Sequence, residues 1–186
     1  MFRPDFSASA AAAMSGGARA VMLAAAFATA LGLAATSSAA GAAELPLRKA
    51  GRWHMTTVMD EGAGPKERTL TMCIDADMER NTAANSKAEH EKNCSLYEIK
   101  KDGDATIVDA TCLFDARKVE SHTRMSGDFE SNFDIEIKST TSGTEYGKPV
   151  SVERTITQKG EYLGADCKDL QAGEAMGSDG SRVMVQ

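Results

Sequence analysis

Four cysteines carry the chemistry that is easiest to interpret from spacing in this chain: Cys73, Cys94, Cys112 and Cys167. They lie 21, 18 and 55 residues apart, so no two of them form a CxxC pair. Structural zinc sites and thioredoxin-type redox centres use such close pairs. An even number of cysteines behind an export leader instead predicts two disulfides and no free thiol nucleophile.

The pairing of the cysteines depends on the register of one predicted hairpin. Asp102-Gly103 favours a two-residue turn between strands at 94–101 and 105–114, and that register places Cys94 opposite Thr111, out of phase with Cys112. A Cys94–Cys112 bond is therefore disfavoured. Two pairings remain open, and we prefer the first because it joins both ends of a helical insert: Cys73–Cys94 with Cys112–Cys167, or Cys73–Cys112 with Cys94–Cys167.

The histidines and serines do not form a recognisable catalytic or metal-binding pattern. His54, His90 and His122 show no HxH or HxxxH spacing. Ser121 and Ser131 lie in predicted strands without the G-x-S-x-G turn of a serine hydrolase. We therefore expect no enzymatic activity, no metal site and no cofactor.

Two further side-chain types could serve a ligand. Met55, Met59, Met72 and Met125 lie on strand faces, where thioethers could bind copper, but their apolar neighbours favour packing or an adaptable pocket lining. Arg154 falls in one row with Val150, Val152 and Ile156. Such an inward charge either protects an edge strand from pairing or meets an anionic headgroup at the rim of a curved sheet.

The first 42 residues differ from the rest of the chain and read as a signal peptide. Arg3 and Arg19 precede an uncharged Ala-rich run that closes on Ala40-Gly41-Ala42, a cleavage pattern that places the mature start at Ala43. The run is too short to cross a bilayer, so no membrane insertion is expected after cleavage. The whole chain has a formal net charge of −6, and loss of Arg3, Arg19 and Asp5 leaves −7. Nucleic acid is excluded as a partner because binding it requires basic clusters.

The elements that would position these residues are antiparallel strands. Apolar and polar residues alternate in seven segments separated by turn signals, which predicts a mainly β fold: an up-and-down meander forming a strongly curved sheet or small barrel. One short helical insert is predicted at about 75–92, with Asp75 as its N-cap. We expect a single domain over 43–167 and a disordered tail over 168–186.

The segment GDFESNFDIEIKS, residues 127–139, poses the functional question. Phe129, Phe133, Ile135 and Ile137 alternate with polar residues, which predicts a strand with one apolar face. That face covers either a filled core or a cavity. The candidate ligand-facing residues on it and on its neighbours are Trp53, Met55, Met72, Met125, Phe129, Phe133 and Arg154.

Several short motifs occur in a characteristic order: the G-x-W opening of LPLRKAGRWHMTTVM, TMCID before the insert, a second cysteine opening a strand, ATCLF, GDFESNF and GADC. In this order they resemble the domain-of-unknown-function family numbered 3617, small periplasmic proteins of Gram-negative bacteria, over about residues 45–167. The resemblance implies a compact antiparallel β fold and a periplasmic location. It implies no reaction.

Two functions remain. The first is a non-catalytic binding module whose curved sheet holds a small hydrophobic or amphipathic molecule. The second is a structural or interaction module with a filled core, which pairs with an envelope protein through a strand edge.

Overall fold

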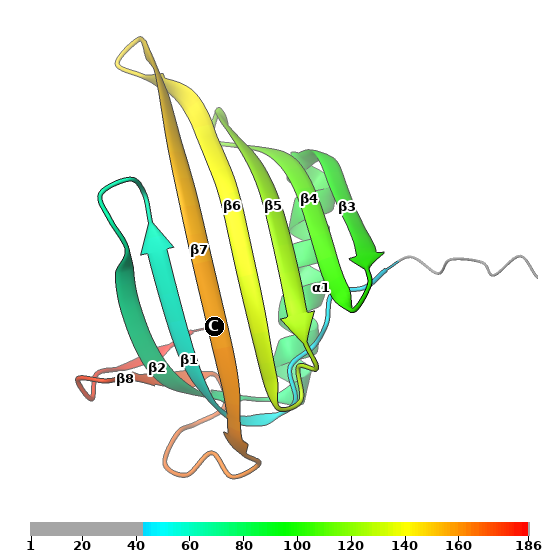
Figure 1. The fold of residues 1–186 in the computed structure, drawn as a ribbon, viewed down its shortest axis with the longest axis vertical. Helices are drawn as coiled ribbons and strands as arrows, with labels where there is room; N and C mark the ends of the chain where they lie inside the picture. The colour runs from blue at the N-terminus through cyan, green and yellow to red at the C-terminus, as the bar shows by residue number, and fades with distance from the viewer. Residues whose placement is uncertain (1–42, 186) are drawn as a thin grey trace, which may run out of the picture. The chain divides into compact units, whose positions relative to one another are not determined.

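The structure, a computed structural model, describes residues 43–185 and there consists of one antiparallel sheet and one helix (Figure 1). The predicted signal peptide, residues 1–42, lies outside the described residues. The elements in chain order are β1 (Gly51–Asp60), β2 (Lys66–Ile74), α1 (Ala76–Asn93), β3 (Cys94–Asp102), β4 (Ala105–Phe114), β5 (Arg117–Gly127), β6 (Asn132–Glu145), β7 (Lys148–Gly164), β8 (Glu174–Gly177) and β9 (Arg182–Met184).

The strands follow the order β3-β4-β5-β6-β7-β1-β2-β8-β9. The mainly β class, the antiparallel meander and the helical insert are confirmed. The sheet is open, with β3 and β9 as its edges within residues 43–185, so the barrel alternative is wrong. The sheet contains two strands more than the predicted seven, β8 and β9.

The two faces of the sheet have opposite character. The inner face carries Trp53, Met55, Phe133 and Ile135, and α1 lies over part of this face, behind β4 and β5 in Figure 1. The outer face is polar and carries the ion pairs of Asp109 and its neighbours. The alternation of apolar and polar residues in the sequence therefore predicted which side chains face the core and which face solvent.

The core occupies one end of the inner face. Trp53, Phe133 and Met55 are 0%, 1% and 2% exposed. The Trp53 ring lies 5.4 Å from Phe133 and 5.3 Å from Tyr162, measured between centroids. Its indole Nε1–H donates to the carbonyl of Lys49 at 2.8 Å, which satisfies the one polar atom of this buried side chain.

Residues 127–139 are not one continuous strand. β5 ends at Gly127 and β6 begins at Asn132, with a turn between them that is organised by Asp128. The Asp128 carboxylate accepts the backbone N–H groups of Glu130, Ser131 and Asn132 at 2.8, 2.7 and 3.1 Å. These bonds and the Ser131 hydroxyl hold the pKa of Asp128 far below its usual range.

That turn places Phe129 in the core by a route that alternation did not predict. Phe129 has a φ of 57° and stacks on Phe133 with ring centroids 5.2 Å apart. The two phenylalanines share a core as expected, but a turn, and not strand periodicity, brings them together.

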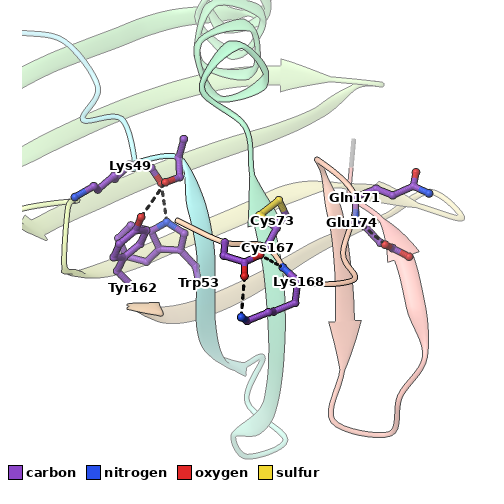
Figure 2. The surroundings of a disulfide bond; sticks show 10 residues. Lys49, Trp53, Cys73, Tyr162, Cys167, Lys168, Gln171 and Glu174 are labelled. Carbon is purple, nitrogen blue, oxygen red and sulfur yellow. Dashed lines mark hydrogen bonds and ion pairs between the residues drawn. A yellow bond between two sulfur atoms is a disulfide. The ribbon is translucent and has the colours of Figure 1, made fainter. Parts of the chain in front are cut away.

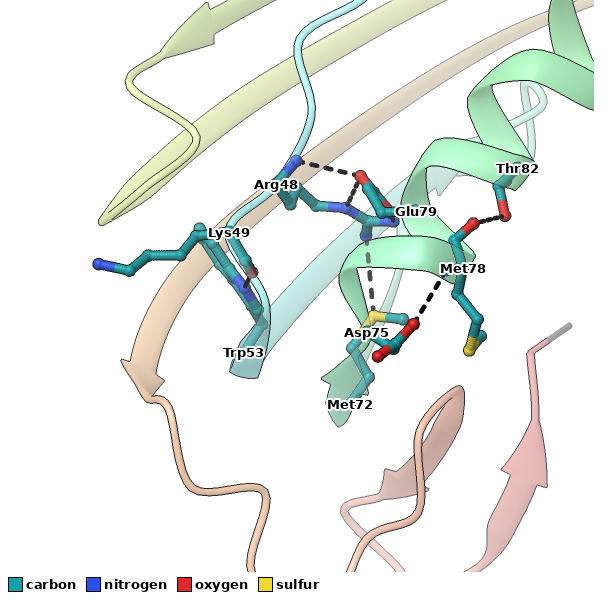
Figure 3. A network of polar contacts seen from close by, with 8 residues as sticks. All are labelled: Arg48, Lys49, Trp53, Met72, Asp75, Met78, Glu79 and Thr82. Atoms are coloured by element: carbon teal, nitrogen blue, oxygen red, sulfur yellow. Dashed lines mark hydrogen bonds and ion pairs between the residues drawn. The ribbon is translucent and has the colours of Figure 1, made fainter.

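Helix α1 begins at its predicted cap. The Asp75 side chain accepts the backbone N–H groups of Asp77 and Met78 at 2.9 and 3.0 Å. One turn further, the Glu79 carboxylate accepts from Arg48 Nε at 2.8 Å and Nη2 at 2.7 Å (Figure 3). This pair ties the start of α1 to the segment that precedes β1.

Both disulfides expected from the cysteine count are present, but both predicted pairings are wrong. Cys94 pairs with Cys112, and Cys73 pairs with Cys167. The preferred Cys73–Cys94 bond fails because α1 separates these residues: 18 helical residues span about 27 Å, beyond disulfide reach.

The Cys94–Cys112 bond forms because the hairpin register differs from the predicted one. Asp102 pairs with Ala105, so Gly103 and Asp104 form the turn, and a register shift between Cys94 and Leu96 then brings Cys94 opposite Cys112. Their Cα atoms lie 3.8 Å apart. The irregular pairing of β3 with β4 thus allows the Cys94–Cys112 bond that a regular register would disfavour.

The C-terminal segment, predicted to be disordered, is ordered through residue 185. Cys167 is bonded to Cys73 of β2 (Figure 2). The N–H of Gly173 donates to the carbonyl of Cys73 at 2.9 Å. Beyond it, β8 pairs with β2 and β9 pairs with β8. Backbone pairing on an available edge does not require many apolar side chains, so composition was a poor guide here.

Candidate functional site

A cleft lies between α1 and the inner face of the sheet. Its volume is about 300 Å³. Its floor consists of apolar side chains from β4, β5, β6 and β7, and Ser86 and His90 of α1 and Leu45 contribute the other side. We refer to it as the helix cleft. Its floor residues include Val108, Met125, Ile135, Ile137 and Ile156.

The composition of α1 explains why this space is not filled. The sequence ADMERNTAANSKAEHEKN has few large apolar residues, and Glu79 is the one buried residue among its described positions. Where α1 faces the cleft it presents a serine and a histidine. A helix that packed on a sheet would normally present an apolar stripe. Small and polar residues instead leave the apolar floor partly uncovered.

His90 has a defined orientation at the cleft. Its Nδ1 lies 2.6 Å from the carbonyl oxygen of Ser86, which can only accept, so Nδ1 carries the proton. The ring stacks on Tyr97 with centroids 4.7 Å apart. Burial, with a smaller contribution from Glu91, raises the pKa of Tyr97, which is consistent with an environment poor in water.

The helix cleft continues towards the N-terminal end of α1. A second hollow of about 220 Å³ shares several lining residues with it and ends at the Arg48–Glu79 ion pair. Phe129 and Leu47 add apolar surface there. The shared residues are Leu45, Ser86, Met125, Ile135 and Gln158.

The candidate ligand-facing residues fall into three groups. Met125 and Phe129 line the hollows under α1. Trp53, Met55 and Phe133 belong to the buried core cluster. Trp53, Met55 and Phe133 therefore pack against one another in the core and do not line the helix cleft.

Met72 and Arg154 lie apart from the helix cleft. Met72 packs against the core, and its sulfur accepts from Arg48 Nη1 at 3.8 Å. The Arg154 guanidinium bonds the carboxylate of Glu61, with Nε 2.5 Å from Oε1. Arg154 does not line the cleft, and its charge is already paired.

Sequence reasoning did not select several cleft residues as site candidates. Alternation within 105–114 places Val108 on the inner face, so that signal was present. Alternation likewise places Tyr97 and Gln158 on that face. Ser86 and His90 had no such signal, because their roles depend on where α1 lies over the sheet.

The outer face has a larger hollow of about 570 Å³, which is shallow and lined mainly by polar and charged residues. Asp109 lies within it and accepts from Lys100 Nζ at 2.6 Å and from His122 Nδ1 at 2.7 Å. These two hydrogen bonds, that of Lys100 first, lower the pKa of Asp109. Within residues 43–185, no group of three His, Cys, Asp or Glu residues is arranged to hold a metal ion.

No helix among the described residues is both long and apolar enough to span a membrane.

A family model described as "Protein of unknown function (DUF3617)" matches residues 48–167 of the chain. Comparison with curated proteins and with solved structures gave no match.

Proposed function

We propose that this chain, which belongs to the DUF3617 family, is an exported, non-catalytic binding module that holds a small hydrophobic or amphipathic molecule in the helix cleft. The family assignment agrees with the resemblance of its motifs and assigns no reaction.

One observation carries the proposal: an apolar floor lies beneath a helix that does not fill the space above it. Ile137 and Ile156 pair across β6 and β7, and Met125 and Ile135 pair across β5 and β6. All four side chains border the cleft and are only partly buried. Ligand pockets are commonly apolar hollows of this size with a few polar groups at defined positions.

The larger outer hollow supports a ligand less well. Two of its carboxylates, those of Asp109 and Glu120, are already paired with Lys100 and Lys118. Binding there would replace existing ion pairs in water, where exposed charges contribute little. The smaller helix cleft offers apolar area whose removal from water is favourable.

The exported location rests on the disulfides and on the predicted leader. Cys73–Cys167 and Cys94–Cys112 require an oxidising compartment to form and persist. We infer from them, and from the predicted signal peptide over 1–42, that the protein works in the periplasm.

Native mass spectrometry of protein isolated without detergent tests the proposal. We expect a co-purifying small molecule on the natural chain, and loss of that mass in Thr123→Phe, which places a ring in the cleft between Val108 and Ile137. Thr155→Phe is the matched control, because Thr155 is exposed on the outer face of β7. Equal occupancy of all three proteins would place the ligand outside the cleft.

A second candidate function is supported by edge strand β9. Val183 and Met184 of this strand are 55% and 58% exposed, so β9 offers both an unpaired edge and apolar side chains to a partner strand. At the other edge, β3 carries several charged residues, which protect edge strands from pairing. Photo-crosslinking from position 183 in intact cells, with position 155 as control, distinguishes this function: a specific adduct at 183 alone supports an envelope-protein partner.

A further inference from the structure

The helix cleft has no formally charged side chain on its wall. Among the described residues that line it there is no Asp, Glu, Lys or Arg. The polar groups are those of Ser86, His90, Tyr97, Thr123 and Gln158, together with Ser121. A ligand in this space therefore meets hydrogen-bonding groups and apolar surface, but no fixed charge.

Several charged groups near the cleft are already paired. Arg48 and Glu79, which end the neighbouring hollow, bond each other at 2.7 and 2.8 Å. Arg154 bonds Glu61. An ionised ligand group that entered the cleft would lose its hydration without gaining a counter-ion, which is strongly unfavourable.

The polar groups of the cleft suit a neutral partner. With its Nδ1 proton donated to Ser86, His90 has Nε2 as a hydrogen-bond acceptor in the neutral ring. Within residues 43–185, the hydroxyls of Tyr97 and Thr123 have no hydrogen-bond partner. These groups can bond a hydroxyl, carbonyl or amide.

We propose that the helix cleft selects an uncharged amphiphile, with its apolar part on the floor of Val108, Ile137 and Ile156 and a hydroxyl, carbonyl or amide group towards His90 and Tyr97. This inference rests on the proposed function, because it specifies the ligand of the same cleft. It replaces the expectation that Arg154 meets an anionic headgroup.

Two fluorescent probes that differ by one charged group provide the test. N-phenyl-1-naphthylamine is uncharged at neutral pH, and 8-anilino-1-naphthalenesulfonate carries a sulfonate on the same ring system. We expect the full mature chain to bind the neutral probe at least tenfold more tightly, a difference of about 1.4 kcal/mol. Equal affinities, or tighter binding of the sulfonate, would overturn the selectivity while leaving a binding module. Binding of neither probe would overturn the proposed function as well.

A charge-insertion variant assigns the selectivity to the cleft. Thr123→Lys places a cation among the floor residues and should shift the ratio of affinities at least tenfold towards the sulfonate. Thr155→Lys, on the outer face, should leave the ratio unchanged. If Thr123→Lys does not fold, Gln158→Lys tests the same point from β7. An unchanged ratio in a folded cleft variant would contradict the proposal.

Discussion

The ring of Phe133 occupies the space that a side chain on Gly160 would fill. The two residues are cross-strand partners in β6 and β7, and a Cβ built on Gly160 would overlap the ring. The glycine thus lets a large aromatic side chain lie against the sheet and reach Trp53 and Phe129. This relationship defines the filled end of the inner face.

Gly160→Ala should therefore lower the free energy of unfolding by about 1–3 kcal/mol, because the added methyl group overpacks the core. Gly143→Ala in β6 is the control, since its Cβ would meet the flexible side chain of Arg117 at 3.3 Å. Urea unfolding of both variants measures the difference. Equal effects would mean that Phe133 does not require the glycine.

Phe133→Ala and Ile137→Ala separate the filled core from the cleft. Phe133 is fully buried, so its removal leaves a cavity and should cost about 3–5 kcal/mol. Ile137 borders the helix cleft and is partly buried, so its truncation should cost less, under about 2 kcal/mol in the ligand-free protein. Chemical denaturation decides, and an Ile137→Ala cost as large as that of Phe133→Ala would show that no hollow exists there.

The two disulfides should differ in both the size and the location of their effects. Cys73–Cys167 closes a span of 94 residues and Cys94–Cys112 one of 18, so their loss should cost about 4–5 and about 3 kcal/mol, respectively. Hydrogen exchange of the two double Cys→Ser variants should show faster exchange in β8 and β9 for the first pair and at the end of α1 for the second. The opposite assignment would contradict the observed pairing.

Acid should weaken the turn organised by Asp128. Its carboxylate accepts three backbone N–H groups, and its folded pKa is held below the unfolded value of about 4. This contribution is complete above pH 4 and is lost as pH falls towards the folded pKa. Asp128→Asn should be less stable than the natural chain at pH 7, with a difference that shrinks below pH 4 in thermal unfolding curves. A constant difference would show that the charge does not stabilise the turn.

The positions of the strands could be predicted from the sequence more reliably than the contacts between them. Alternation located β1 to β7 and Asp75 marked the start of α1, because both signals are local. The Cys94–Cys112 pairing depended on a turn one residue further along and on a register shift near Ser95, which no local pattern specified. Phe129 entered the core through a turn with positive φ, which alternation cannot represent.

The candidate site was predictable only in part. The apolar floor followed from strand periodicity, and Met125 was selected on that basis. The cleft itself arises because α1 lies over the floor without an apolar face of its own, and the position of a helix over a sheet is not encoded in a short motif. The ordered segment after Cys167 was missed for a related reason, since its stability comes from backbone pairing with β2.

Methyl NMR during titration with N-phenyl-1-naphthylamine would show directly where a ligand binds. We expect saturable shifts of the Ile137, Ile156 and Val108 methyl groups on the cleft floor, with the core methyl of Met55 little affected. Shifts confined to exposed positions such as Val183, with Ile137 and Ile156 unmoved at saturation, would contradict a ligand in the helix cleft.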